Sequence, residues 1–229
     1  MSKRKQKSKA PEAPPLSDLV VLAADKDTYQ VIEGLLVKRT PSLQIRPITH
    51  KIIGHPDHDP GCLNGSAPFL SVYLRTCRYA LVVFDREGCG REKLTREELE
   101  SAVEADLKRS GWEDRAAVIV VDPELENWVW NRSPHVEASL GWKEQTIGLR
   151  EWLIEQSFLP DDAQPKPDRP KEAMQAVLAH LGKPWSASIF RALAEKVSFA
   201  HCEDPAFLKF LETLRKWFPH GRSSARTLP

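Results

Sequence analysis

The stretch YALVVFDREGCG, residues 79–90, contains the clearest structural signal in the sequence. Tyr79–Phe84 is an apolar run of strand length, which is typical of a strand buried on both faces of a parallel sheet. Asp85 and Glu87 follow this run directly. The pattern therefore predicts a buried strand with two carboxylates at its carboxyl end.

The segment after residue 90 predicts a helix and a second strand beside the first. Thr95 and Glu98 have the spacing of a capping box, and Gly111 provides a left-handed helix stop. The apolar run Ala116–Val121 then predicts another buried strand. Because a strand–helix–strand unit joins parallel neighbours by a right-handed crossover, the acidic residues after both strands are expected at one edge of the sheet.

The segment before residue 79 predicts two more strands. Leu19–Ala24 is a continuous apolar run, and Asp27 is expected to cap the helix that follows it. Leu43–Thr49 predicts a second strand, at the edge of the sheet because Pro47 cannot donate a ladder hydrogen bond. The polar residues 50–66 predict a long loop.

The remaining elements are predicted to be helices, and the second half of the chain to be all-helical. Prolines between residues 160 and 170 predict a loop within that half. Helices are expected around Pro68–Cys77, Lys143–Phe158, Lys171–Leu181, Ala187–Val197 and Pro205–Trp217. The predicted fold class is α/β, with a mostly parallel sheet flanked by helices and an all-helical carboxyl-terminal part. The predicted divisions are a disordered basic tail at 1–17, an α/β domain at 18–140, a helical subdomain at 141–218 and a flexible tail at 219–229.

Composition indicates a folded cytoplasmic protein with no membrane partner. The chain has 229 residues, of which 41% are hydrophobic, enough for a core. No apolar stretch approaches the roughly 18 residues that span a bilayer, and no secretory signal follows the basic amino terminus. The four cysteines form no CxxC pair. Residues 1–17 hold five basic side chains against one acidic one, so they are expected to contact nucleic-acid phosphates or an acidic partner.

Acidic groups follow three of the apolar runs. They are Asp25 and Asp27, then Asp85 and Glu87, then Asp122, Glu124 and Glu126. Open α/β sheets bind ligands at the carboxyl ends of their strands, and clustered carboxylates suit Mg²⁺ or Mn²⁺. We therefore expect a divalent-metal site in which Asp25, Asp27, Asp85, Glu87, Glu124 and Glu126 are the candidate ligands. The alternative is that these acids only cap helices and occupy loops.

Such a site suits phosphoryl chemistry, which also needs a cation or a general acid near the phosphate. Lys171 opens a predicted helix after the proline-rich loop and is the first candidate, with Lys166 second. The alternative is that Lys171 is a solvated residue at the start of a helix.

Two other features allow more than one interpretation. His55, Asp57, His58 and Asp59 have ligand-like spacing for a transition metal, but a flexible polar loop ending in an Asp59-Pro60-Gly61 turn is the favoured interpretation. Trp128 and Trp130 could stack on bases, although packing in the core is favoured for both.

The motifs FDRE (84–87) and LENW (125–128) resemble the Toprim superfamily, and in particular bacterial domains related to OLD-type and RloB-type nucleases. The resemblance covers about residues 19–130 and, more loosely, the helical half with its Pro170-Lys171 pair. It implies a Toprim-like fold and a metal-dependent nuclease for DNA or RNA, with Asp25, Asp85, Glu126 and Lys171 as catalytic residues. It also implies bacterial anti-phage defence, including methylation-linked systems, with other defence proteins as partners.

The first motif departs from that family. Toprim domains have Val-Glu-Gly after the first strand, whereas this chain has AADKD at 23–27. The alternative function is therefore a catalytically inactive Toprim-like subunit that binds a partner protein or nucleic acid.

Overall fold

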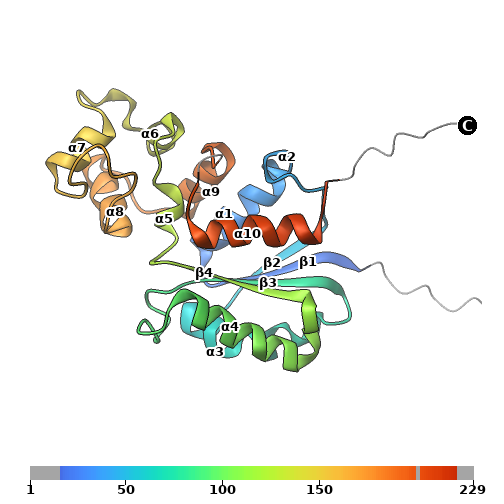
Figure 1. The fold of residues 1–229 in the computed structure, drawn as a ribbon. Coiled ribbons are helices and arrows are strands. Elements are labelled where there is room, and N and C mark those ends of the chain that lie inside the picture. Colours follow the sequence, from blue (N-terminus) through green and yellow to red (C-terminus); the bar gives the residue numbers. More distant parts are fainter. Residues whose placement is uncertain (1–15, 200–201, 221–229) are drawn as a thin grey trace, which may run out of the picture.

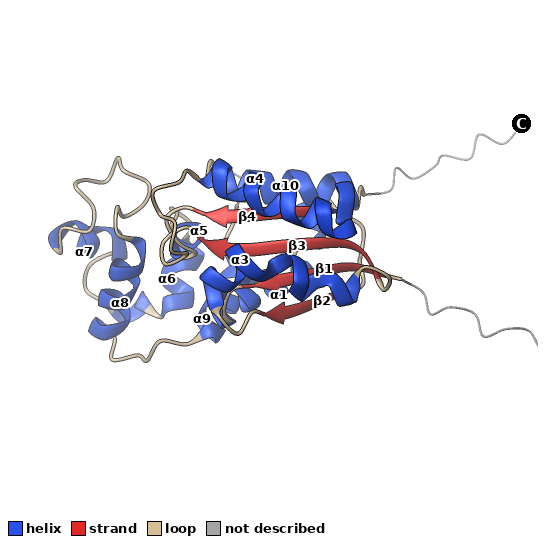
Figure 2. Cartoon of the chain, turned by 90° about the horizontal axis from the view of Figure 1, so that it is seen from below, coloured by secondary structure: helices blue, strands red, loops and turns tan. Residues whose placement is uncertain are grey.

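Within the described residues, four parallel strands form one sheet in the order β2-β1-β3-β4 (Figure 2). The strands are β1 (Ser17–Ala23), β2 (His50–Gly54), β3 (Cys77–Asp85) and β4 (Ala116–Val121). Because they all run the same way, their carboxyl ends meet at one edge, beside the helices of the second half of the chain (Figure 2). The predicted fold class is confirmed.

Helices cover both faces of this sheet. Helices α3 and α4 lie on one face, and α1 and α10 lie on the other (Figure 1). The α-helices are α1 (Lys26–Lys38), α2 (Thr40–Leu43), α3 (His58–Leu70), α4 (Arg96–Leu107), α5 (Glu126–Val129), α6 (Pro134–Leu140), α7 (Leu149–Glu155), α8 (Pro170–His180), α9 (Ala187–Lys196) and α10 (Pro205–Trp217). Short helical turns are η1 (Ser71–Tyr73), η2 (Lys108–Trp112), η3 (Glu113–Arg115) and η4 (Trp142–Glu144).

Burial on both faces explains the continuous apolar strands. Along β1, Leu19 and Val21 pack in the core beneath α1 and α10, whereas Val20 and Leu22 pack beneath α3 and α4. All four side chains are 0% exposed. Successive side chains of a strand point to opposite faces, so a strand between two helical layers needs apolar residues at every position.

The unit β3–α4–β4 agrees with the sequence prediction to within a few residues. Thr95 caps α4, its side chain accepts from the Glu98 N–H, and the Glu98 carboxylate accepts from the Thr95 N–H at 2.8 Å. Gly111 has a φ of 99°, the left-handed conformation expected of the residue that ends this helical segment. The apolar runs and capping residues that define these elements are close together in the sequence. The sequence pattern alone was therefore enough to predict them.

The predicted cap of α1 is wrong by two residues. Asp25, not Asp27, is the N-cap: its Oδ1 accepts from the Thr28 N–H at 2.8 Å, and its backbone is extended. Asp27 instead lies in the first turn of the helix. Both aspartates therefore remain at the carboxyl end of β1, but in different roles.

The predicted strand Leu43–Thr49 is also wrong. Leu43 closes α2, Gln44 has a left-handed φ of 59°, and the second strand begins only at His50. Pro47 lies in the irregular segment between them, consistent with its inability to pair within a ladder.

The predicted loop at 50–66 contains β2 and most of α3, and the predicted helix Pro68–Cys77 holds only the end of α3 and η1. Gly61 and Gly65 are inside α3 because the His55 ring packs on that face of the helix. A Cβ on Gly61 would lie 2.0 Å from His55 Nδ1. These glycines signal close packing and not a turn.

In the second half, the predicted helix Lys143–Phe158 is broken into η4 and α7, whereas the other three helices match. Helix α10 returns to the sheet and packs beside β4 (Figure 1). The helical half therefore contributes one helix, α10, to the layer that it shares with α1, and a group of helices, α6 to α8, beyond the carboxyl edge.

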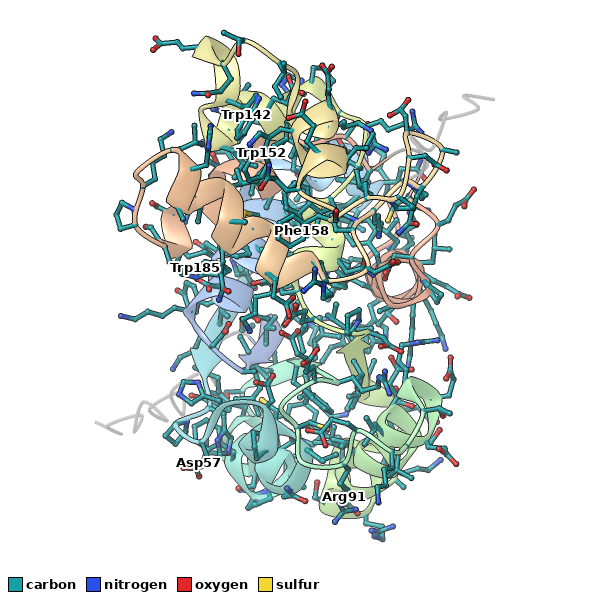
Figure 3. All side chains as sticks on the ribbon, turned by 90° about the vertical axis from the view of Figure 1, so that its left-hand side faces the viewer. Asp57, Arg91, Trp142, Trp152, Phe158 and Trp185 are labelled. Atoms are coloured by element: carbon teal, nitrogen blue, oxygen red, sulfur yellow. The ribbon has the colours of Figure 1, made fainter. Side chains whose placement is uncertain are left out.

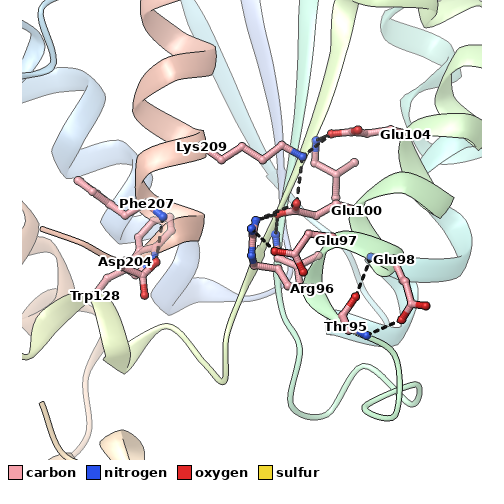
Figure 4. A network of polar contacts seen from close by, with 12 residues as sticks. Thr95, Arg96, Glu97, Glu98, Glu100, Glu104, Trp128, Asp204, Phe207 and Lys209 are labelled. Atoms are coloured by element: carbon pink, nitrogen blue, oxygen red, sulfur yellow. Dashed lines mark hydrogen bonds and ion pairs between the residues drawn. The ribbon is translucent and has the colours of Figure 1, made fainter.

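Two glutamates of α4 bind the outer edge of β4 (Figure 4). Glu104 accepts from the Val118 N–H at 3.0 Å, and Glu100 accepts from the Val120 N–H at 3.1 Å. Lys209 of α10 bridges both glutamates, at 3.1 Å from Glu100 and 2.7 Å from Glu104. Unpaired edge groups invite pairing with another chain, and these contacts satisfy them.

The structure is a computed structural model, and it describes residues 16–199 and 202–220. The two predicted tails lie outside these ranges, except for Leu16, Ser17, Pro219 and His220. No helix in the described ranges is both long and apolar enough to cross a membrane.

Candidate functional site

Two carboxylates at the carboxyl edge of the sheet have buried oxygen atoms without a hydrogen-bond partner. Asp85 is the last residue of β3, and Glu126 is the first residue of α5, just beyond β4. Asp85 Oδ1 and Glu126 Oε2 are both buried and accept no hydrogen bond from the described residues. Leaving a buried polar atom unpaired costs free energy, and a bound cation or water at these oxygens would remove that cost.

Burial and mutual repulsion oppose ionisation of this pair. Burial raises the pKa of Asp85 well above its usual value, and the charges of Asp59 and Glu126 raise it further. Burial, with a smaller effect of the Glu124 charge, raises the pKa of Glu126 to about 7. A cation bound between the two groups would oppose both effects. The site is thus suited to hold a positive charge.

Asp59 belongs to this cluster, although the sequence pattern placed it in a turn. Its Oδ1 accepts from the Asp85 backbone N–H at 2.8 Å, so α3 fixes the end of β3. Burial raises the pKa of Asp59, the hydrogen bond from Asp85 lowers it, and the charge of Asp25 raises it. The expected Asp59-Pro60-Gly61 turn is instead the start of α3.

Asp25 and Asp27 extend the cluster from β1. Asp25 is half-buried, and its charge contributes to the raised pKa values of Asp85 and Asp59. Asp27 Oδ2 accepts a hydrogen bond from Trp185 Nε1 at 2.7 Å. Burial raises the pKa of Asp27 despite that bond. The acidic residues after β1 therefore lie with those after β3 and β4, as the predicted parallel topology requires.

Lys171 supplies a cation to the cluster from the distant helix α8. Glu124, which is 4% exposed, accepts from the Lys171 backbone N–H at 3.0 Å, and its other oxygen lies 3.4 Å from Lys171 Nζ. Partial burial lowers the pKa of Lys171, but the charges of Glu126 and Glu124 outweigh it, so the pKa is raised. The ammonium therefore stays charged beside the carboxylates.

Other candidates lie at the margin of the site or elsewhere. Glu87 is exposed and is close enough for its charge to raise the pKa of Glu124. Asp122 forms an ion pair with Arg86 at 2.8 Å. Lys166, the second lysine candidate, is 3.7 Å from Asp204. Lys166 is therefore engaged in a different ion pair.

The histidines of the predicted loop do not converge on a metal site. His55 is buried, its ring centroid is 4.7 Å from that of Phe69, and its Nδ1 accepts from the Asp57 N–H at 3.1 Å. More generally, in residues 16–199 and 202–220 no three His, Cys, Asp or Glu side chains form a ready-made metal cage. A cation held here would need water or substrate oxygens beside the carboxylates, which is usual for Mg²⁺.

Trp128 and Trp130 belong to the core, as the favoured interpretation predicted. Trp128 packs edge-on against Phe207, with ring centroids 5.0 Å apart, and its Nε1 donates to Asp204. Trp130 is 3% exposed and donates to the Pro170 carbonyl. Trp128 also lines an apolar cavity of about 630 Å³ that does not include the acidic cluster.

Comparisons with known proteins add little to this geometry. No family model and no curated protein matches the chain. A solved structure, the C-terminal region of the OLD protein of Xanthomonas campestris pv. campestris, covers 89% of this chain and 92% of its own length, with 13% identity and a TM-score of 0.46. That likeness is too weak to assign a fold or a function, and the α/β assignment therefore depends on the strands and helices of the chain itself.

Proposed function

We propose that this chain is a divalent-metal-dependent nuclease that hydrolyses phosphodiester bonds in DNA or RNA, with Mg²⁺ or Mn²⁺ as its cofactor. The observation that supports this most directly is the pair of buried, unpartnered oxygens, Asp85 Oδ1 and Glu126 Oε2, at one edge of a parallel sheet. The raised pKa values of the two groups support it further, because a bound cation would stabilise their ionised forms.

The carboxylates fit a hard divalent cation. Asp85 and Glu126 would hold it, with Asp25 beside Asp85 and with Asp27, Glu87 and Glu124 as further candidate ligands. When bound, such a cation supplies a nucleophilic hydroxide and neutralises phosphate charge. The preference of Mg²⁺ and Mn²⁺ for oxygen ligands matches a cluster made only of carboxylates.

The other side chains position this chemistry. Asp59 fixes the backbone of Asp85 through the 2.8 Å hydrogen bond, and Glu124 orients Lys171 through its backbone and side chain. Lys171 Nζ would donate to a phosphate oxygen and can give a proton to the leaving oxygen. Asp25, Asp85, Glu126 and Lys171 are thus the proposed catalytic residues.

Cleavage assays with matched variants test this proposal. Full-length protein with MnCl₂ or MgCl₂ is expected to cleave labelled single-stranded or duplex DNA or RNA, and Asp85→Asn and Glu126→Gln are expected to remove that activity. Glu100→Gln is the matched control, because Glu100 is as buried as Glu126 but lies on the flank of β4. Cleavage that survives Asp85→Asn or excess EDTA would contradict the proposal.

A catalytically inactive binding subunit is the second candidate. It is favoured by the absence of a ready-made three-ligand cage in the described residues and by Asp25 standing where Toprim domains have glutamate. Titration calorimetry separates the two candidates: no Mn²⁺ binding by either the wild type or Glu126→Gln supports the inactive subunit.

A role in anti-phage defence with other defence proteins is proposed from the resemblance alone. Phage plating on bacteria that express the chain from its own gene neighbourhood, with and without Asp85→Asn, tests this role. Equal plating on both strains would count against it.

A further inference from the structure

Trp185 is an exposed aromatic side chain bound directly to the acidic cluster. It is 37% exposed, and every other tryptophan and phenylalanine of the described residues is less exposed. Its Nε1 donates to Asp27 Oδ2 at 2.7 Å, across 158 residues of sequence. Figure 3 shows Trp185 between the segment that holds Trp142 and Trp152, in η4 and α7, and the part of the molecule that contains Asp57.

Local structure explains part of this arrangement. Ser186 caps α9, so Trp185 precedes the cap and Phe190 is the fourth residue of the helix. Their ring centroids are 5.4 Å apart, as in a hydrophobic staple. Any large apolar side chain could form this staple. A staple does not require the hydrogen bond to Asp27, which fixes the indole beside the carboxylates.

The other tryptophans are unsuited to contact a substrate. Trp142 and Trp152 are 2% and 9% exposed and pack against each other. Trp112 and Trp130 are 0% and 3% exposed, and Trp128 and Trp217 are partly buried against other aromatic rings. Trp185 alone among these combines an open surface with a direct bond to a proposed site residue.

We propose that Trp185 is a stacking platform for an unpaired nucleobase, and that the substrate is single-stranded nucleic acid or a strand with an unpaired nucleotide at the site. This inference rests on the proposed nuclease function and names its substrate class. Stacking on an aromatic side chain needs a free base face, which duplex neighbours cover, and it tolerates any base. Stacking also adds binding free energy at a site where the carboxylates repel phosphate.

Two variants separate stacking from the structural role of Trp185. Trp185→Leu keeps an apolar staple but removes the aromatic face, and Trp185→Phe keeps an aromatic face but removes the N–H. Binding is measured by fluorescence anisotropy on a labelled oligothymidylate, on the same strand with abasic sites, and on a blunt hairpin duplex. CaCl₂ replaces MnCl₂ in these titrations.

The wild type is expected to bind oligothymidylate about tenfold more tightly than the abasic strand, since one stacked base contributes about this much. Trp185→Leu is expected to abolish that preference, and Trp185→Phe to keep most of it. Both variants should melt within a few degrees of the wild type. Equal binding of oligothymidylate by Trp185→Leu and the wild type, or an undiminished preference over the abasic strand, overturns the inference.

These binding titrations, together with cleavage assays in MnCl₂, distinguish failure of the inference from failure of the nuclease proposal. If the wild type and Trp185→Leu cleave single strands with the same KM, the stacking role fails and the nuclease stands. If Trp185→Leu loses its preference for strands with bases but the wild type never cleaves, the stacking role stands and the nuclease fails. No binding to any of the three probes overturns both.

Discussion

Glu100 and Glu126 are equally buried, each 3% exposed, yet their surroundings differ completely. Glu100 accepts from Arg96 at 2.8 Å, from Lys209 at 3.1 Å and from the Val120 N–H at 3.1 Å (Figure 4). Glu126 Oε2 has no partner in the described parts of the chain, and burial raises the pKa of its carboxyl to about 7. The protein thus pairs one buried carboxylate with two cations and leaves an oxygen of the other without a partner among the described residues.

The two glutamates also differ in where their helices place them. Glu100 lies on α4 beside the flank of β4, where it closes a sheet edge. Glu126 opens α5 at the carboxyl edge, where parallel sheets bind ligands. Burial alone therefore does not identify a functional acid. Glu126 is proposed as a functional acid because it combines a missing partner with a position at the carboxyl edge.

The two lysines beside these glutamates provide the largest expected contrast. Lys171→Met is expected to lower the cleavage rate about 10²-fold or more, the size of effect typical of a general acid. Lys209→Met is expected to leave the rate within about twofold, because Lys209 contacts Glu100 and Glu104 on the flank of β4. Single-turnover rates on a saturating substrate measure both. Equal loss of activity in the two variants would contradict the different roles given to Lys171 and Lys209.

Truncation of Glu100 should strongly destabilise the fold. Glu100→Ala leaves Arg96 without its buried partner and the Val120 N–H unpaired, which costs about 3 kcal/mol. Urea unfolding followed by circular dichroism measures the change, with Glu97→Ala as the exposed control on the same helix. A loss below about 1 kcal/mol would mean that the network is dispensable.

Replacement of Glu126, unlike truncation of Glu100, should raise the free energy of unfolding at neutral pH. The folded pKa of about 7 exceeds the ordinary 4.5, so the native state binds more protons between these values and the free energy of unfolding falls as pH rises through that window. In EDTA at pH 7.5, Glu126→Gln is therefore expected to stabilise the protein by about 1–3 kcal/mol. The gain should shrink at pH 4.5 to 5.

Thermal melts at the two pH values measure this effect. Mn²⁺ should raise the melting temperature of the wild type at pH 7.5 but not that of Glu126→Gln, since only the wild type holds the carboxylate. A variant that is less stable than the wild type at pH 7.5 in EDTA would contradict the raised pKa.

The smallest expected effect is at the start of α4. Thr95→Ala removes the side chain that accepts from the Glu98 N–H, and loss of such a cap costs about 1 kcal/mol. Glu100 lies one turn further along, so its contacts should survive and Mn²⁺ affinity should not change. Chemical denaturation measures the loss of stability, and calorimetry measures the Mn²⁺ affinity. An altered Mn²⁺ affinity would show that the start of α4 and the acidic cluster are coupled.

Local signals determined the elements that the sequence predicted well. The strand β4 has the predicted bounds, and the capping box of α4 is as expected, because both depend on residues next to each other in the chain. The predictions were wrong where a residue type can have more than one structural role. The sequence pattern predicts Gly61 in a turn, whereas in the fold Gly61 makes room for His55. The pattern also predicts Asp27 as the cap of α1, a role that Asp25 has instead.

The parallel unit β3–α4–β4 and the carboxylates at the strand ends follow from local sequence, since each apolar run and its polar end consist of consecutive residues. The partners of those carboxylates depend on long-range packing. Lys171 reaches Glu124 across 47 residues, and Trp185 reaches Asp27 across 158. Asp59 joins the site only because α3 packs against the end of β3. The partner of a buried charge comes from a segment that is distant in the sequence and packs against it in the fold. A local sequence pattern contains no information on such a contact.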